Sequence, residues 1–182
     1  MVVREQTLVT LTVDEICRKL PFSILGLDVD NDSAFINETV LAYCGERGIQ
    51  MTRSRAYKKN DQAWIEQKNG AVVRKLVGYG WLEGAAAATA LSQLHEVARL
   101  YVNFFQSSSK LRSKRRQGAR VLKWHDVPAT PFSRLLASDR VGAETKKRLQ
   151  EVFDVLDPVQ LLAKIRQAQQ RLAALAVRGA SK

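Results

Sequence analysis

Two carboxylates in this sequence have the residue types and setting that metal-assisted phosphate chemistry requires. Asp30 ends an apolar run that begins at Phe22, and Glu66 lies in a helix-like stretch; residues 31–65, 35 in all, separate them. Hard divalent cations prefer oxygen ligands, and phosphoryl transfer by two metals needs several carboxylates that converge on one point. Taken alone, a turn aspartate and a surface glutamate would be the simpler interpretation of this pair.

The segments around Asp30 are typical of an α/β protein. The elements predicted before position 60 alternate between helix and strand: helix 4–20, strand 22–29, helix 38–47 and strand 49–53. The first strand is apolar, of the kind buried on both faces of a sheet. Pro21 stops the first helix and Gly48 closes the second. Asp30 is therefore expected at the carboxyl end of a strand, where α/β sheets usually bind ligands.

A helix that begins near Asn60 is predicted to carry Glu66 and to end at the glycine break over residues 78–80. Its expected buried row comprises Ile65, Val72 and Leu76. Because Glu66 is rotated by roughly 100° from Ile65, the carboxylate can face a cleft while the helix stays anchored.

Composition changes after Gln106, and this change divides the chain into three predicted domains. Residues 1–106 hold both acids and end in a long helix over 83–105; residues 107–140 are a basic arm or linker followed by a short irregular segment. Residues 141–182 are a C-terminal helical segment. Its last helix carries an apolar stripe of about two heptads, too short for a coiled coil, so docking on the body or on the preceding helix is favoured over self-association.

The charge balance points to a polyanionic partner. The 182 residues include 29 basic and 18 acidic ones, for a net charge of +11. Nucleic acid is the usual partner of such a protein, and a basic protein merely kept soluble by its charge is the alternative. Cys17 and Cys44 have no zinc-ligand spacing, which indicates two buried, reduced thiols in a cytosolic protein. Without a signal-peptide pattern or a long apolar run, we expect no membrane partner and a cytoplasmic protein, nucleoid-associated when bound to DNA.

The basic residues gather in three places that could contact DNA phosphates, with a solvated basic surface as the simpler interpretation. The loop before the Glu66 helix holds Arg53, Arg55, Lys58 and Lys59. The helix itself adds Lys68 and Arg74. The basic arm holds Lys110, Arg112, Lys114, Arg115, Arg116, Arg120 and Lys123, without an acid among them. Such an arm could follow a DNA backbone independently of sequence.

Several stretches resemble blocks of DDE transposases and retroviral-type integrases. The segment around Asp30 reads Asp28-Val-Asp-Asn-Asp-Ser-Ala-Phe-Ile-Asn37. The most specific block leads to Glu66 and reads Thr52-Arg-Ser-Arg-Ala-Tyr-Lys-Lys-Asn-Asp-Gln-Ala-Trp-Ile-Glu-Gln-Lys-Asn69. Leu100-Tyr-Val-Asn-Phe-Phe-Gln106 and Thr130-Pro-Phe-Ser-Arg-Leu-Leu136 are similar to later blocks of bacterial insertion-sequence transposases. The resemblance covers essentially the whole chain.

The resemblance implies a ribonuclease H-like integrase core that cleaves and joins DNA strands with two Mg²⁺ or Mn²⁺ ions. Asp30 and Glu66 match the second and third of three catalytic, metal-binding acids. The first acid should lie on an earlier strand, but the acids before Asp30 are Glu5, Asp14 and Glu15 in the first helix and Asp28 on the same strand. We therefore expect an amino-terminally truncated core with an exposed sheet edge, and a chain that is catalytically inactive alone.

Two other functions stay open. A non-catalytic DNA-binding remnant could interfere with full-length transposase by occupying DNA or by forming mixed oligomers, and a homo-oligomer is equally compatible. A basic RNA-associated structural protein is the second rival, and it leaves the spacing of Asp30 and Glu66 unexplained.

Overall fold

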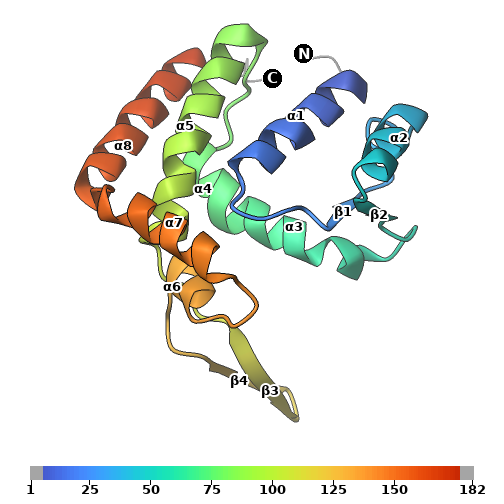
Figure 1. Cartoon of the computed structure of the whole chain (residues 1–182). Helices are drawn as coiled ribbons and strands as arrows, with labels where there is room; N and C mark the ends of the chain where they lie inside the picture. The colour runs from blue at the N-terminus through green and yellow to red at the C-terminus, as the bar shows by residue number, and fades with distance from the viewer. Residues whose placement is uncertain (1–5, 177–182) are drawn as a thin grey trace, which may run out of the picture. The chain divides into compact units, whose positions relative to one another are not determined.

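The computed structural model describes residues 6–176, apart from the side chains of Lys59 and Trp64, and has a mixed α/β architecture (Figure 1). The described residues up to Ala85 form one compact unit, and Ala86–Ala176 form a second. Within residues 6–176, no helix combines the length and the apolar character that a membrane span requires.

A parallel strand–helix–strand unit is the centre of the first unit. Its elements are β1 (Gly26–Val29), α2 (Glu38–Glu46) and β2 (Gln50–Arg53). The two strands pair in parallel, with the first residue of β1 opposite the first of β2 and the last opposite the last. The predicted alternation of strand, helix and strand is confirmed; β1 begins four residues later than expected, and α2 and β2 are each one residue shorter.

Local chemistry explains where α2 begins and ends. The Asn37 side chain accepts a hydrogen bond from the Val40 amide at 3.0 Å, which is the usual role of an N-cap. Gly48 follows the helix with φ +65°, a conformation that glycine adopts without strain. Val40, Cys44 and Ile49 form the small buried core beneath the helix. Burial raises the pKa of the Cys44 thiol. The expected burial is thus confirmed for Cys44, whereas Cys17 is only half-buried.

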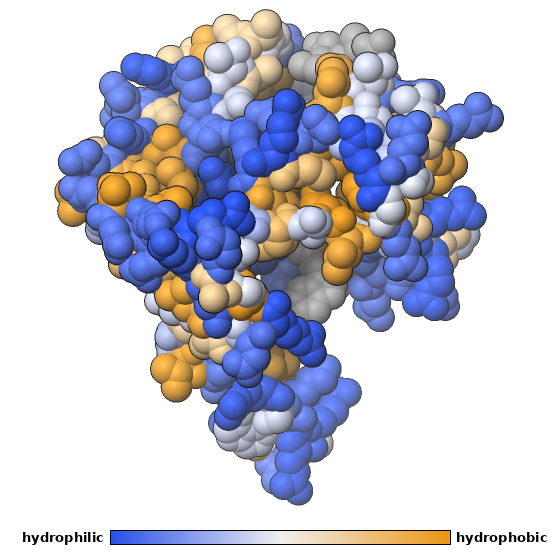
Figure 2. Space-filling model, in the orientation of Figure 1, coloured by the Kyte–Doolittle hydropathy of each residue, from blue (hydrophilic) through white to orange (hydrophobic). Residues whose placement is uncertain are grey.

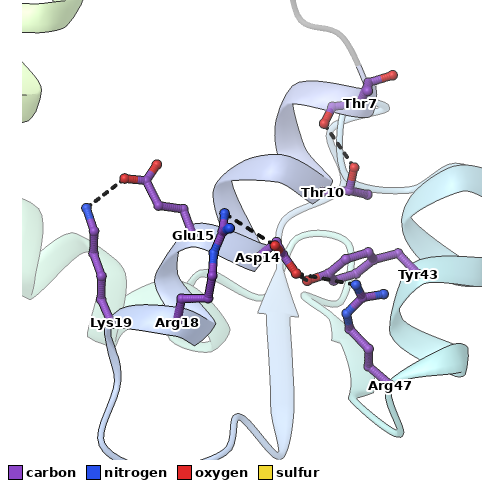
Figure 3. A network of polar contacts seen from close by, with 8 residues as sticks. All are labelled: Thr7, Thr10, Asp14, Glu15, Arg18, Lys19, Tyr43 and Arg47. Carbon is purple, nitrogen blue, oxygen red and sulfur yellow. Dashed lines mark hydrogen bonds and ion pairs between the residues drawn. The ribbon is translucent and has the colours of Figure 1, made fainter.

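Helix α1 (Gln6–Lys19) packs on α2 through a polar network centred on Asp14 (Figure 3). Its carboxylate accepts hydrogen bonds from the Tyr43 hydroxyl and the Arg47 guanidinium, both at 3.3 Å. Arg47 also lies over the Tyr43 ring, 4.0 Å from its centre. Burial, reinforced by Asp14 and opposed by Arg47, raises the pKa of the Tyr43 phenol. The helix was expected over 4–20, and its first two predicted residues lie outside the described part.

The expectation that the first strand is buried on both faces is wrong. Val29 is buried, but Gly26 and Asp28 on β1 are exposed, and Leu25 just before it is 82% exposed. The reason is that β1 and β2 form a sheet of two strands in the described residues, so β1 has an open edge and little covers its second face. The expected exposed sheet edge is thus present.

The segment that carries Glu66 is helical but not a single regular α-helix. It runs through a 3₁₀ turn η1 (Lys59–Gln62), α3 (Ala63–Lys68), a π-helical turn η2 (Asn69–Val73) and α4 (Arg74–Val77). The prediction that Ile65 belongs to the buried row is wrong, because this side chain is 56% exposed. A π-turn inserts an extra residue into the helix and rotates what precedes it, so Ile65 loses its alignment with Val72 and Leu76, which are half-buried.

The second unit consists of helices around an aromatic core, with a hairpin attached. Its elements are most of α5 (Gly84–Phe104), β3 (Leu111–Gln117), β4 (Arg120–His125), α6 (Pro131–Leu136), α7 (Ala143–Asp154) and α8 (Pro158–Leu175). The core stacks Phe132 against Phe104 and Phe153, with ring centres 5.0 and 4.9 Å apart. The segment predicted as a basic arm or linker is an antiparallel hairpin with a register shift between Leu111 and Ser113, so the linker alternative is wrong.

Helix α8 starts as the sequence predicts. Asp157 accepts hydrogen bonds from the amides of the second and third residues of the helix, at 2.8 and 3.2 Å. Leu161, Ile165 and Leu172 of its apolar stripe are buried, which agrees with the predicted docking of this helix, while Leu175 at the end of the stripe is 40% exposed.

Candidate nucleic-acid interface

Asp30 follows directly on β1, at the carboxyl end of the parallel strand pair, as the sequence predicts. The residue is half-buried, and its Oδ1 accepts a hydrogen bond from the Asp32 amide at 3.0 Å. The Asp32 carboxylate in turn accepts one from the Ala34 amide at 2.9 Å. The first contribution of Asp30 is therefore to shape the turn that leads into α2.

The loop after β2 lies beside this turn and is tied to it. Asn31 donates through its side-chain amide to the Ser54 carbonyl at 2.9 Å, and the Ser54 amide donates to the Val29 carbonyl at 2.9 Å. Because the carboxyl ends of parallel strands meet at one edge of a sheet, the two loops share that edge. Together they line a hollow of about 450 Å³ with Asn31, Arg53, Ser54, Arg55 and Ala56.

Arg55 is engaged within this loop by Asp61. Its Nε and Nη2 donate to the two carboxylate oxygens of Asp61, each at 2.9 Å, and its backbone amide donates at 3.0 Å. The hydrogen bonds from Arg55 hold the pKa of Asp61 at about 2. A phosphate that reached Arg55 would have to share the guanidinium with this carboxylate.

The other basic residues predicted to contact DNA in this region lie on two different segments. Arg53, the last residue of β2, and Lys58, on the loop after it, are both exposed, and in the described part of the chain neither makes an ion pair. Lys68 and Arg74 are exposed farther along the helical segment, where the Arg74 guanidinium lies 5.1 Å from the centre of the Tyr79 ring. The side chain of Lys59 lies outside the described residues.

Glu66 is exposed on α3, three residues before the π-turn begins. The Asp28 carboxylate on β1 accepts a hydrogen bond from the Thr52 hydroxyl at 2.8 Å across the sheet. Within residues 6–176, no group of three or more His, Cys, Asp or Glu side chains is arranged to hold a metal ion.

This arrangement can be tested against the Mg²⁺ or Mn²⁺ pair that the sequence resemblance implies. Two-metal sites need several carboxylate oxygens around one point. One oxygen of Asp30 already accepts the Asp32 amide, and Glu66 lies exposed on its helix. The described side chains therefore do not by themselves fit a two-metal centre.

The β3–β4 hairpin presents the largest group of predicted DNA contacts. All seven basic residues of this region are exposed, namely Lys110, Arg112, Lys114, Arg115, Arg116, Arg120 and Lys123. The strands are joined by a two-residue turn in which Gly118 has φ +58° while Ala119 does not have a positive φ. Glycine with positive φ at the first central position is typical of a type II′ turn, whose twist matches that of a hairpin.

The base of the hairpin is held by a pair that sequence reasoning missed. The Arg134 guanidinium donates to the Asp126 carboxylate at 2.6 and 3.3 Å and to the Ser108 carbonyl at 2.6 Å. Asp126 also accepts from the Lys110 amide, and the hydrogen bonds from Arg134 hold the pKa of Asp126 at about 2. One signal could have revealed the pair, since Asp126 is the only acid between Glu96 and Asp139.

The Thr130–Leu136 segment builds this anchor. Thr130 caps α6 by accepting the Ser133 amide at 3.0 Å, and Pro131 occupies the first helical turn. Phe132 is buried in the aromatic core, while Arg134 reaches the hairpin base. The segment therefore links the helical core of the second unit to the cationic hairpin.

Comparison with known proteins places the chain beside a rhizobial protein. No family model matches the sequence. The chain is 55% identical over 131 residues to "Uncharacterized protein y4rM" of Sinorhizobium fredii (strain NBRC 101917 / NGR234), a match that covers 72% of this chain and 37% of that protein. The chain thus spans little more than a third of the length of this relative.

Proposed function

We propose that this chain is a DNA-binding part of a DDE transposase or integrase, a protein of DNA integration and recombination in a mobile element. The observation that carries the proposal is the position of Asp30 at the carboxyl end of a parallel strand, beside a loop that contributes Arg53 and Arg55. Phosphate-handling sites in α/β sheets form at this kind of edge. The sequence resemblance supports DNA as the phosphate-bearing partner.

The proposed fold of residues 1–106 is a ribonuclease H-like core. Its support is the parallel strand–helix–strand order, with Asp30 after the first strand and Glu66 on the helix after the second. The resemblance requires three acids, and Asp30 and Glu66 match two of them. A bound Mg²⁺ or Mn²⁺ pair is therefore proposed only for an assembly in which a third carboxylate joins these two.

The isolated chain is accordingly proposed to bind DNA without cleaving it. A second candidate function follows, that of a non-catalytic DNA-binding protein which interferes with an intact transposase by occupying DNA or by mixed oligomers. The exposed cations of the hairpin favour it, because phosphate binding by Lys and Arg needs no metal ion.

A combined binding and nicking assay tests the proposal. Binding to a labelled DNA duplex should be salt-sensitive, with an affinity on the order of micromolar at physiological salt. Asp30→Asn and Glu66→Gln should leave this binding intact, as should the control variants Asp139→Asn and Glu151→Gln, which alter exposed acids elsewhere.

The outcomes of this assay separate the candidate functions. Metal-dependent nicking that disappears in Asp30→Asn and Glu66→Gln, but not in the controls, would show that the chain cleaves DNA alone. Binding without nicking supports the proposed DNA-binding role. A chain that binds no DNA, or that prefers RNA and ignores Mg²⁺, would overturn the proposal.

A further inference from the structure

The β3–β4 hairpin carries positive charge on both of its faces. Residues paired across an antiparallel ribbon share a face, and successive residues of one strand alternate between faces. Lys114 pairs with Lys123 and Arg116 with Val121, whereas Arg115 pairs with Leu122 and Gln117 with Arg120. The first face therefore carries Lys114, Arg116 and Lys123, and the second face carries Arg115 and Arg120.

The first face has a charge arrangement that is unfavourable in the protein alone. Lys114 and Lys123 lie directly opposite each other, and like charges at this position destabilise a sheet. Among the described residues, neither lysine forms an ion pair with an acid. A polyanion that bound here would relieve the repulsion, so the pair favours the bound state over the free one.

The hairpin is also held in place without covering either face. Every residue of β3 is exposed, and in β4 only Leu122 is half-buried. An isolated two-stranded ribbon is marginally stable in water. Here the Asp126–Arg134 pair and the backbone bridge between Ser108 and Ala129 fix its base to the second unit. In Figure 2 the visible surface of the ribbon is almost wholly hydrophilic.

The thickness and the charges of the hairpin match one groove of double-stranded nucleic acid. A sheet with side chains on both faces is about 10 Å thick, and the B-DNA major groove is about 12 Å wide. We propose that the β3–β4 hairpin stands in the major groove of B-form DNA, with one cationic face toward the phosphates of each wall. This inference rests on the proposed DNA-binding function and adds the form of the duplex and the mode of contact.

The same features disfavour other nucleic acids. The major groove of A-form RNA is deep and narrow, so side chains cannot enter it. Single-strand binding without sequence preference uses aromatic platforms for successive bases, and the ribbon carries one aromatic residue, Trp124, near its base. The contacts proposed here are to phosphates, so they position the protein without reading a sequence.

The salt dependence of binding tests whether both faces take part. Lys114→Gln with Lys123→Gln removes two charges from the first face, and Arg115→Gln with Arg120→Gln removes two from the second. Each double variant should lower the slope of log affinity against log salt by about 1.8, the value for two lost phosphate contacts. Lys164→Gln with Arg166→Gln, on the exposed side of α8, removes the same charge and should leave the slope unchanged.

Chemical footprinting tests the groove. Dimethyl sulfate methylates guanine N7 in the major groove and adenine N3 in the minor groove. Bound protein should protect N7, and each hairpin double variant should lose that protection. Circular dichroism and a thermal melt check that the variants are folded, which is expected because all four positions are exposed. Affinity for a duplex RNA of the same sequence should be weaker and should not depend on the hairpin.

The results distinguish this inference from the proposed function. The groove placement would be overturned if only one of the two double variants lowers the salt slope. It would also be overturned if bound protein leaves the reactivity of guanine N7 unchanged, or if duplex RNA binds as tightly as DNA. If the control on α8 lowers the slope as much as the hairpin variants, the placement also falls. DNA binding that persists unchanged in both hairpin variants would sink the inference and leave the DNA-binding proposal standing, whereas absence of any DNA binding would sink both.

Discussion

Two arginine–aspartate pairs determine how the loops around the candidate interface are held. Asp61 fixes Arg55 beside the loop after β2, and Asp126 with Arg134 fixes the hairpin base. No periodic pattern predicts either pair, because each is set by how loops fold back; the one sequence signal is the isolation of Asp126 as the single acid between Glu96 and Asp139. The position of Asp30 could be predicted, since an apolar run ending in a turn motif indicates a strand end.

Removing Arg134 should release the hairpin from its anchor. In Arg134→Gln the charge-assisted contacts to Asp126 and Ser108 are lost, so the amides at the hairpin base open more often. Hydrogen exchange of the Ser108 and Ala129 amides should be faster in the variant. Lys164→Gln, an exposed position on α8, serves as the control, and equal protection in Arg134→Gln and wild type would contradict the anchoring role.

The same pairs make the protein sensitive to acid. Asp61 and Asp126 have folded-state pKa values of about 2, below the ordinary value near 4, because arginine stabilises their ionised forms. Their contribution to stability is fully present above about pH 4 and is lost as the pH falls toward 2. Urea unfolding between pH 6 and 2.5 should show this loss. In the double variant Asp61→Asn, Asp126→Asn the decline in that window should be shallower, and an equally steep decline would rule out these pairs as its cause.

Among the helices and strands, those with a periodic apolar pattern or a capping residue could be predicted from the sequence, and those without such a signal could not. The order strand, helix, strand around α2 and the start of α8 follow from apolar patterns and capping residues. The β3–β4 hairpin was missed because charges on both faces erase the alternating pattern of a half-buried strand. Its one local signal is Gly118 at the turn. The π-turn after Glu66 has no such signal and displaced Ile65 from its predicted burial.

Gly118 should be sensitive to substitution. With φ +58°, an alanine there would cost about 1–2 kcal/mol of local stability, although the site has open space for a side chain. NMR cross-strand contacts between Arg116 and Val121 should weaken in Gly118→Ala and be largely kept in Gly118→Asn, because asparagine tolerates this conformation better. Gly45→Ala in α2 has space and no positive φ, and it should stabilise by about 0.5–1 kcal/mol. Unchanged contacts in Gly118→Ala would contradict the turn assignment.

In the whole molecule, the two groups of candidate site residues lie in different compact units. The first holds the turn with Asp30 and the helical segment with Glu66, and the second holds the cationic hairpin on an aromatic core. The mixed α/β class and the basic character could be predicted from composition and pattern. Whether the carboxylates of Asp30 and Glu66 converge could not be predicted, because convergence of side chains depends on tertiary packing that no spacing rule encodes.

The stability of the second unit should depend on the centre of α5. Leu94 is fully buried, so Leu94→Ala leaves a cavity and should lower the free energy of unfolding by about 2–5 kcal/mol. Urea unfolding followed by hydrogen exchange can assign the loss to Ala86–Ala176. Val159→Ala, at a position 73% exposed, is the matched control and should change little. A loss below about 1 kcal/mol in Leu94→Ala would mean that α5 is not central to this unit.

The open presentation of the β3–β4 hairpin has a consequence for how the protein can change over generations. Apart from the half-buried Leu122, the side chains of its strands are exposed, and Gly118 is the one residue in it with a positive φ. Mutations along the hairpin can therefore raise or lower the affinity for a charged partner in small steps, while the rest of the protein keeps its fold.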